Sequence, residues 1–253
     1  MFTVSRLDVA PVKGLALNHP DEVELTPTGV PENRRFFVVE ENGKLVNGTK
    51  DSPFYLVRAE TDPEGTRLAL TFPGERVVDA EVELGDPVVT AFWDRPVRGR
   101  PVMGPWADGL SDLVGRTVRI VRAEEPGGGA DDSPVSILTD ASLEKLAKES
   151  GEGTVDGRRF RMLVHVAGTK PHAEDEWIGR EVAIGSTLVR VTKNDARCRM
   201  TTRNPETGVK DFDTLKEIKA YRGLREGKSI DFGVYADVVT PGTIRVGDPV
   251  EPR

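Results

Sequence analysis

Residues 181–193 read EVAIGSTLVRVTK. On both sides of Gly185-Ser186, apolar and polar residues alternate, which is the pattern of two strands that each bury one face. A glycine at the first position of a two-residue loop is what a type II′ turn requires. The stretch therefore predicts a β-hairpin, and similar short alternating runs recur along most of the chain.

Turn signals such as Glu-Asn-Gly, Pro-Gly and Gly-Asp separate these runs, which cover residues 34–40, 54–60, 67–72, 86–93, 116–122 and 158–166. Only two segments predict helices. One is 139–151, with Asp140 as its cap and Gly151 as its terminator, and the other is 211–223, which ends at Gly223. Because strands do not alternate regularly with helices, we predict a mainly β protein with a few helices (α+β), built from barrels or sandwiches.

The segment PGGGADDSP at 126–134 interrupts the strand patterns with three consecutive glycines and an acidic pair. Exposed linkers between domains have this composition. We therefore predict two domains, 1–125 and 126–253. The first is nearly all β, and the second holds both predicted helices.

Composition limits the classes of function. The net charge of −7 argues against a general nucleic-acid or anionic-membrane binder. A single Cys excludes a disulfide framework within the chain and a zinc or iron-sulfur site with several Cys ligands. The start, MFTVSRLDVAPVKGL, resembles no signal peptide, and no run of about 18 apolar residues occurs. We expect a cytoplasmic protein with neither nucleic acid nor membrane as partner.

The residue best suited to chemistry is Cys198, in KNDARCRMTTRNPETG at 193–208. It follows the predicted hairpin, so we expect it in a loop at the edge of a sheet. Nearby cations lower the pKa of a thiol and favour the thiolate, which is both a nucleophile and a soft metal ligand. Four basic residues surround it in sequence: Lys193, Arg197, Arg199 and Arg203. The alternative is an inert, buried Cys.

Several motifs resemble a known family in their order and spacing. The most specific are Arg-Cys followed by Thr-Thr, then Pro-x-Thr-Gly, and Gly-Thr-Ile-Arg-Val-Gly-Asp near the end. With the segments around them, these span PVKG at 11–14, NRRFFVVEENGKLV at 33–46, DSPVSILTDASLEKL at 132–146, RRFRMLVHVAG at 158–168, EDEWIGREVAIG at 174–185, RCRMTTRNPETG at 197–208, LKEIKAYRG at 215–223 and TPGTIRVGDPVE at 240–251. The chain resembles proteins with an N-terminal β-barrel followed by a molybdenum cofactor sulfurase C-terminal (MOSC) domain, in particular the amidoxime-reducing components and their bacterial relatives.

The resemblance implies an N-terminal β-barrel domain followed by a MOSC β-barrel, and the molybdenum cofactor (molybdopterin) as ligand. Cys198 matches the metal ligand and catalytic position. The predicted cofactor-binding residues are Lys13, Arg35, Asp131, Ser133, Arg161, Arg197 and Thr201. Among them, Lys13 is expected in the first barrel loop and Arg161 on a strand, and Arg35 has a structural ion pair as its alternative. Pyridoxal phosphate is associated with the family, and no residue of this chain points to it.

The implied activity is the reduction of N-hydroxylated or N-oxide small molecules, with electrons from a separate electron-transfer partner. Two alternatives remain open: a carrier of sulfur or of the molybdenum cofactor, and a non-catalytic binding protein. The chain departs from the family pattern at Leu163, where the reductases have Asn, and at Asp195, where some members have Cys. It also reads Asn-Gly-Thr-Lys at 47–50, so Lys50 replaces a phosphate-binding Arg only if this loop shifts by one residue.

Lys13 and Cys198 lie far apart in the sequence, so they share a pocket only if the N-terminal domain packs over the cysteine loop. The residues assigned to the pocket are basic, although the chain is acidic. We therefore expect a positively charged cleft between the two domains, where ligand sites often lie.

Overall fold

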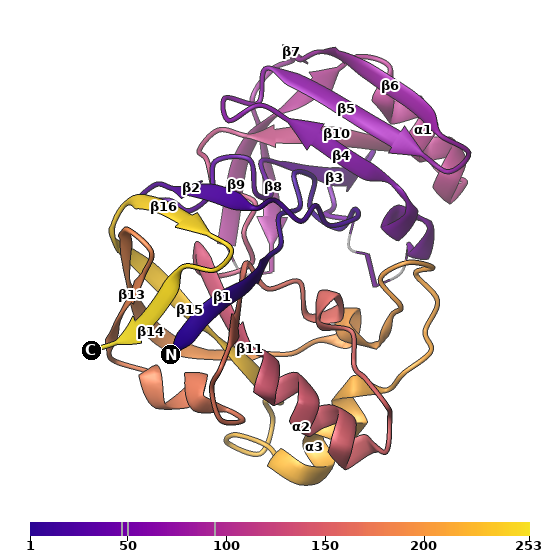
Figure 1. Ribbon diagram of the computed structural model, residues 1–253. Helices are drawn as coiled ribbons and strands as arrows, with labels where there is room; N and C mark the ends of the chain where they lie inside the picture. Colours follow the sequence, from indigo (N-terminus) through magenta and orange to yellow (C-terminus); the bar gives the residue numbers. More distant parts are fainter. Residues whose placement is uncertain (47, 50, 94) are drawn as a thin grey trace.

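The structure is a computed structural model that describes residues 1–46, 48–49, 51–93 and 95–253 (Figure 1). The predicted Lys50 lies outside the described residues. Strands predominate, which confirms the mainly β, α+β prediction. Among the described residues, no helix combines the length and the apolar character needed to cross a membrane.

Seven strands of the described chain form a closed barrel. In barrel order they are β1 (Phe2–Leu7), β12 (Val164–Ala167), β11 (Val135–Thr139), β15 (Asp231–Thr240), β14 (Thr187–Ala196), β13 (Glu181–Ile184) and β17 (Pro249–Pro252). β1 pairs with both β12 and β17, so it completes the ring, and Figure 1 shows it beside the C-terminal strands. Apolar side chains from alternating positions, such as Val166, Ile184 and Val189, fill the interior.

The N-terminal half holds two further sheets. One has the order β3 (Phe36–Glu40), β10 (Val118–Ala123), β9 (Arg95–Met103), β7 (Glu83–Leu84), with β8 (Val88–Phe92) paired to β9. The other has the order β4 (Arg58–Thr61), β5 (Arg67–Phe72), β6 (Arg76–Glu81). They share a core with α1 (Trp106–Val114), whose Trp106 indole donates to the Leu68 and Val78 carbonyls at 2.9 and 3.1 Å.

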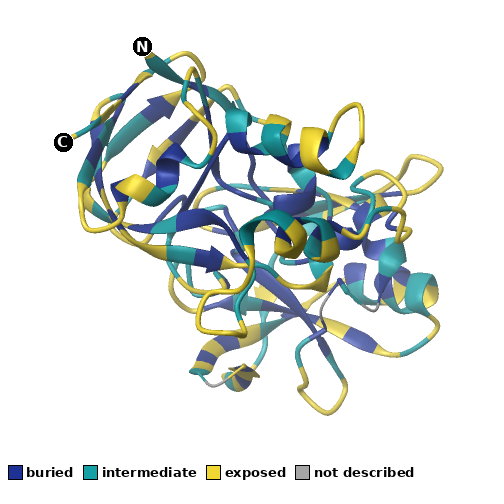
Figure 2. Ribbon diagram, turned by 90° about the horizontal axis from the view of Figure 1, so that it is seen from below, coloured by how far each residue is buried: buried dark blue, intermediate teal, exposed yellow. Residues whose placement is uncertain are grey.

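Strand pairing crosses the predicted boundary at 125/126. β1 belongs to the barrel of later strands, and β2 (Glu22–Leu25) pairs with β16 (Gly242–Arg245). The first 25 residues therefore tie the N-terminal half to the barrel. The boundary itself stays a prediction. Figure 2 shows buried residues concentrated along the strands of both halves and exposed residues in the loops between them.

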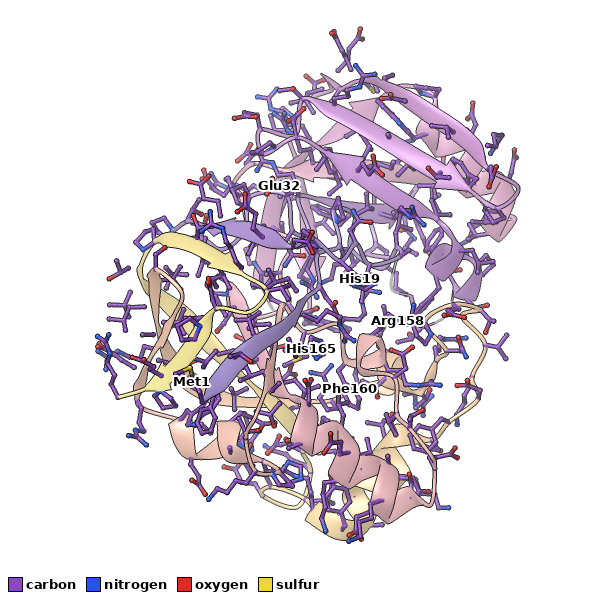
Figure 3. The ribbon with its side chains drawn as sticks, in the orientation of Figure 1. Met1, His19, Glu32, Arg158, Phe160 and His165 are labelled. Atoms are coloured by element: carbon purple, nitrogen blue, oxygen red, sulfur yellow. The ribbon has the colours of Figure 1, made fainter. Side chains whose placement is uncertain are left out.

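A buried carboxylate anchors the chain just after β1. The Asp8 carboxylate accepts hydrogen bonds from His19 Nδ1 at 2.8 Å and from His165 Nε2 at 3.1 Å, and both histidines are labelled in Figure 3. Burial favours the neutral acid, but the two histidines and Arg6 outweigh it and hold the pKa of Asp8 well below its usual range. The cluster joins β1 to β12, because His165 lies on β12.

The predicted hairpin forms as β13 and β14, and Gly185 has a φ of 55° while Ser186 does not lie at positive φ, as a type II′ turn requires. The two predicted helices also form, as α2 (Asp140–Ser150) and α3 (Thr214–Arg222). Gly151 and Gly223 end them, as predicted. The predicted cap of α2 is wrong by one residue, because Thr139 is the N-cap and Asp140 is the first residue of the helix.

The strand predicted over 158–166 is wrong for its first half. Residues Gly157–Phe160 form the short 3-10 helix η2, because the Asp156 carboxylate accepts from the Arg158 amide at 2.9 Å and turns the chain. Arg161 follows with a left-handed φ of 55°, so it does not lie on a strand.

Leu7 tests the role of β1 in the barrel, because it is fully buried there. We expect Leu7→Ala to lower the free energy of unfolding by about 2–5 kcal/mol, since it removes methyl groups from a packed core. Denaturant unfolding measures this. The control Val77→Ala, at a position 59% exposed on β6, should change it by less than about 0.5 kcal/mol. A loss below about 1 kcal/mol for Leu7→Ala would show that the packing of this β1 side chain contributes little to the stability of the barrel.

Candidate functional site

A cavity of about 380 Å³ lies at the junction of the two halves, within the size range of small-molecule sites. The N-terminal half, the 126–134 segment and the barrel all contribute to its wall. The lining residues are Lys13, Gly14, Arg34, Val46, Gly48, Thr49, Trp93, Ala130, Asp131, Ser133, Pro134, Ser136, Arg159, Phe160, Arg161, Asp195, Ala196, Arg197, Cys198, Met200 and Tyr235. Figure 3 labels Phe160 on the barrel side of this junction.

Cys198 lies just after β14, at the start of the 3-10 helix η4 (Arg199–Thr202), and is exposed. It therefore occupies a loop, as predicted, but this loop follows the end of β14 within the closed barrel and does not lie at a sheet edge. The cysteine is not buried, as the alternative required. Thr201 is fully buried and does not line the cavity. Its hydroxyl donates to the Cys198 carbonyl at 3.1 Å and contacts the Thr214 hydroxyl at 2.6 Å, so it holds the cysteine backbone in place.

Lys13 reaches the same cavity from the loop after β1. Its ammonium donates to the Gly129 carbonyl at 3.0 Å and pairs with the Asp131 carboxylate at 2.7 Å. Burial lowers the pKa of Lys13 to about 8, although Asp131 opposes this shift. Burial favours the neutral acid of Asp131, but the charges of Lys13 and Arg34 outweigh it and lower its pKa to about 2.

Arg161 is half-buried and donates to the Leu15 carbonyl at 2.7 Å. Its own carbonyl accepts from the Arg34 guanidinium at 3.1 Å. Burial lowers the pKa of Arg161 to about 10. A guanidinium carries five N–H donors, so each arginine keeps donors for a ligand beside these contacts.

The structure does not bring Arg35 to the cavity. Its guanidinium donates to the carbonyls of Glu124 and Glu64 at 3.5 and 3.3 Å, within the N-terminal half. The preceding Arg34 lines the cavity instead, and its left-handed φ of 54° turns the chain between the two arginines. The family resemblance pointed to Arg35, and only the backbone conformation shows that Arg34 faces the cavity in its place.

The barrel wall carries a group of polar side chains beside the cysteine. Arg197 pairs with Asp195 and donates to the Phe160 carbonyl at 2.5 Å. Burial raises the pKa of Asp195 to about 6, against the effect of Arg197 and of a hydrogen bond from the Tyr235 hydroxyl. Burial, with Asp195 nearby, also raises the pKa of Tyr235. Sequence analysis noted Asp195 only as a departure from the family pattern. No motif in the sequence pointed to Tyr235.

The cavity is more cationic than the chain as a whole. Of the described residues, five basic side chains line it against two carboxylates: Lys13, Arg34, Arg159, Arg161 and Arg197, with Asp131 and Asp195. The chain has a net charge of −7. The predicted positive cleft is therefore present, and Lys13, Asp131, Ser133, Arg161, Arg197 and Cys198 all lie in it. Anions gather at such a local surplus of positive charge.

The comparisons with known families cover both halves. A family model described as the MOSC domain matches residues 124–251, and one described as the MOSC N-terminal beta barrel domain matches residues 1–116. The chain belongs to the MOSC domain family. The resemblance drawn from its motifs is thus confirmed.

Among MOSC relatives, mitochondrial amidoxime-reducing component 1 of Mus musculus is 27% identical in an alignment of 279 positions. This alignment covers 98% of this chain and 81% of that protein. Molybdenum cofactor sulfurase of Caenorhabditis briggsae is 25% identical in a match that covers 92% of this chain and 33% of that protein. The crystal structure of the YuaD protein from Bacillus subtilis aligns with 100% of this chain and 96% of its own, with a TM-score of 0.49 and 11% identity.

The raised pKa of Asp195 predicts a pH-dependent stability. Between the ordinary value of 3.8 and about 6, the folded MOSC protein binds more protons at this carboxyl than the unfolded chain does. The free energy of unfolding must therefore fall as the pH rises through this window. Relative to Asp195→Asn, which cannot titrate there, we expect the wild type to lose on the order of 2 kcal/mol between pH 4 and pH 7.

Denaturant unfolding of both proteins at several pH values measures this difference, and other titrating groups cancel in the comparison. The control is Asp132→Asn, which removes a half-exposed carboxylate paired with Lys193 at 2.7 Å. A wild-type curve parallel to that of Asp195→Asn would contradict the prediction.

Proposed function

We propose that this protein binds the molybdenum cofactor in the cavity between its halves and uses it to reduce N-hydroxylated or N-oxide small molecules. The observation that carries the proposal is the exposed Cys198 thiol on the wall of a cavity that basic side chains line in excess over carboxylates. The relatives named amidoxime-reducing component and molybdenum cofactor sulfurase support it.

The residues present fit an anionic cofactor that brings its own metal ligands. Among the described residues, no group of three or more His, Cys, Asp or Glu side chains could hold a bare metal ion. Cys198 offers one soft thiolate ligand. Arg197 Nε is buried and has no hydrogen-bond partner in the described part of the chain, so it has a donor free for phosphate or pterin oxygens.

A glycine allows two loops to lie close together in one wall of the cavity. A Cβ at Gly48 would lie 2.7 Å from the Met200 methyl group, so a larger residue there would displace the side chain two positions after Cys198. Gly48 thus lets the loop before η1 (Ser52–Leu56) approach the cysteine loop closely. This loop forms part of the cavity that we assign to the cofactor.

When bound, molybdenum would supply two-electron redox chemistry beside Cys198. Reduction of an N–OH group breaks the N–O bond, consumes two electrons and two protons, and releases water. Of the chain's own groups, Cys198 would hold the metal, and Arg161 and Arg197 would hold the anionic part of the cofactor. Asp195, with its pKa of about 6, can hold a proton at the cavity wall near neutral pH.

The electrons would come from a separate electron-transfer protein, because one Cys cannot hold an iron-sulfur cluster. The substrate is a small molecule. Pyridoxal phosphate has no role in this proposal, and the cytoplasmic location expected from the sequence is kept as part of it.

Cys198→Ala tests the metal assignment. In protein from a host that makes the cofactor, we expect this variant to lose molybdenum and N-reductive activity. Its free energy of unfolding should change by less than about 0.5 kcal/mol, since the side chain is exposed. Elemental analysis, pterin fluorescence and denaturant unfolding measure the three effects.

The matched control is Val209→Ala, at a position 58% exposed in the segment after η4. It should retain molybdenum, pterin and activity. Wild-type protein that contains neither molybdenum nor pterin, and that rejects added cofactor, would overturn the proposal. A Cys198→Ala variant that keeps its metal but loses about 2 kcal/mol of stability would show that the cysteine is structural.

A second candidate function is favoured by the exposure of Cys198 itself. An accessible thiol among basic residues can hold a persulfide, and the protein would then carry sulfur rather than reduce a substrate. Mass spectrometry separates the two functions. A labile addition of about 32 Da on Cys198, without reductase activity, would favour the carrier.

A further inference from the structure

A second cavity, of about 440 Å³, lies beside η4 and apart from the Cys198 cavity. We call it the outer pocket, and its lining includes Arg199, Thr202, Arg203, Lys210, Asp213 and Leu215. Residues three apart share a face of a 3-10 helix, so Arg199 and Thr202 face the outer pocket together. Cys198 and Met200 line the Cys198 cavity instead. The short helix η4 thus has one cavity on each side.

A clamp on the backbone completes the wall between the two cavities. The Arg203 guanidinium donates through Nε to the Thr49 carbonyl at 3.0 Å, and Nη2 donates to the same carbonyl. Its Nη1 donates to the Gly208 carbonyl at 2.8 Å. Thr49 lines both cavities, so its backbone and η4 form the partition between them. Each cavity can therefore hold a ligand of its own.

The outer pocket has a surplus of positive charge. Three basic side chains, Arg199, Arg203 and Lys210, line it against the single carboxylate of Asp213. That carboxylate already pairs with Lys210 at 3.3 Å and caps α3 by accepting from the Lys216 amide. Within the described chain, no carboxylate forms an ion pair with either arginine. Two positive charges in the pocket are thus left without an anion.

The two arginines keep N–H donors for a ligand. A guanidinium has five N–H groups, and Arg203 uses three of them on carbonyls, so two remain. Arg199 is exposed, and its donors face the pocket opening. Forked pairs of N–H groups match the oxygens of a phosphate. The pocket also lies at the start of α3, where the positive end of the helix dipole attracts anions.

We propose that the outer pocket is a second anion site, which binds the phosphate group of a small phosphate ester. Arg199 and Arg203 hold the phosphate oxygens, and Lys210, whose backbone pairs with that of Arg203, adds a third charge. A cavity of about 440 Å³ has room for an organic group beside the phosphate, and Leu215 gives that group an apolar contact. The site does not depend on the proposed reductase function, because its three cations do not line the Cys198 cavity.

The depth of the outer pocket favours a small molecule over an acidic protein surface. Thr202 is 5% exposed and Arg203 is half-buried, so part of the lining lies below the molecular surface. A flat protein surface would reach only the protruding Arg199 and Lys210, both of which are exposed. A small ligand can enter the concavity and contact all three cations.

The first experiment locates the ligand by hydrogen exchange of the cofactor-free protein. We expect glycerol 3-phosphate to slow the exchange of amides in residues 199–213, because the ligand joins η4 to the segment that follows it. Glycerol, which lacks the charge, should have no effect. Arg199→Ala should lose this protection, and Arg161→Ala, which alters only the Cys198 cavity, should keep it.

The second experiment measures affinity by calorimetry, in an Arg161→Ala background that weakens anion binding in the Cys198 cavity. We expect Arg199→Ala to raise the Kd for glycerol 3-phosphate about tenfold, since it removes a charged donor from the phosphate. Arg199→Lys should raise it by about threefold, because the charge stays and the fork is lost. Arg203 is left unchanged, because its side chain also holds the backbone.

The matched control is Lys216→Ala. This lysine has a side chain that is 78% exposed on α3 and does not line the outer pocket. Its loss removes the same charge from the same surface, and the Kd should stay within about twofold of the background value, since surface charges outside the site are screened. An equal rise of the Kd for Arg199→Ala and Lys216→Ala would show a diffuse attraction instead of a site.

Further outcomes would also overturn the inference. Exchange in residues 199–213 that does not respond to glycerol 3-phosphate would exclude the site, and protection by polyglutamate alone would assign this surface to an acidic protein. Inorganic phosphate that binds as tightly as the ester would identify the free ion as the ligand. In cofactor-loaded protein the protection should persist, and its loss would assign the pocket to the cofactor. A chain that never takes up cofactor would fail the proposed function, but the experiments on cofactor-free protein would still decide this one.

Discussion

A lysine ammonium buried between the two halves must keep an anionic partner, because an unpaired charge there is costly. Lys13 has that partner in Asp131, and the Gly129 carbonyl accepts a second of its hydrogens. Both acceptors lie in the glycine-rich segment 126–134. This pair turns a segment with the composition of a flexible linker into a wall of the cavity. Arg95 adds to this attachment by donating to the Gly128 carbonyl at 3.2 Å.

The same cavity holds two carboxyls whose pKa values are shifted in opposite directions. Asp131 faces Lys13 and Arg34 and stays ionised, with a pKa of about 2. Asp195 is buried on the barrel wall, and its pKa of about 6 lies near neutrality despite Arg197. When environments separate the pKa values of two acids in one site, the acids can take different tasks. Here one carboxylate holds the cavity wall and is hydrogen-bonded to the Trp93 indole, and the other is able to exchange a proton.

Local patterns predicted the elements whose causes are local. The β13–β14 hairpin follows from one glycine turn, and α2 and α3 follow from an apolar stripe and a terminal glycine. Helix α1 was missed because Gly109 lowers the helix propensity of its sequence. The packing explains that glycine, since a Cβ there would lie 2.7 Å from the Phe72 ring.

The candidate site was only partly predictable, because some of its residues come together only through the packing of the two halves. Family motifs located Cys198, Lys13 and Arg161, and the structure brings all three to one cavity. Tyr235 and Trp93 carry no motif, and only the packing of the two halves brings them to the cysteine. The sequence alone therefore identified the metal-ligand candidate and the cationic character of the cleft. It did not identify the raised pKa of Asp195 or the aromatic side chains of Tyr235 and Trp93 in the cavity wall.

The place of β1 in the barrel has a consequence for synthesis on the ribosome. β1 emerges from the ribosome well before its partners β12 and β17, so the ring cannot close until β17 has been made. The N-terminal core needs only residues between Val12 and Ile120 and can assemble during this interval. Closure then depends on pairing between distant parts of the chain, which is slow. Until that moment β1 is an unpaired edge, and the charge of Arg6 within it opposes pairing with the wrong strand.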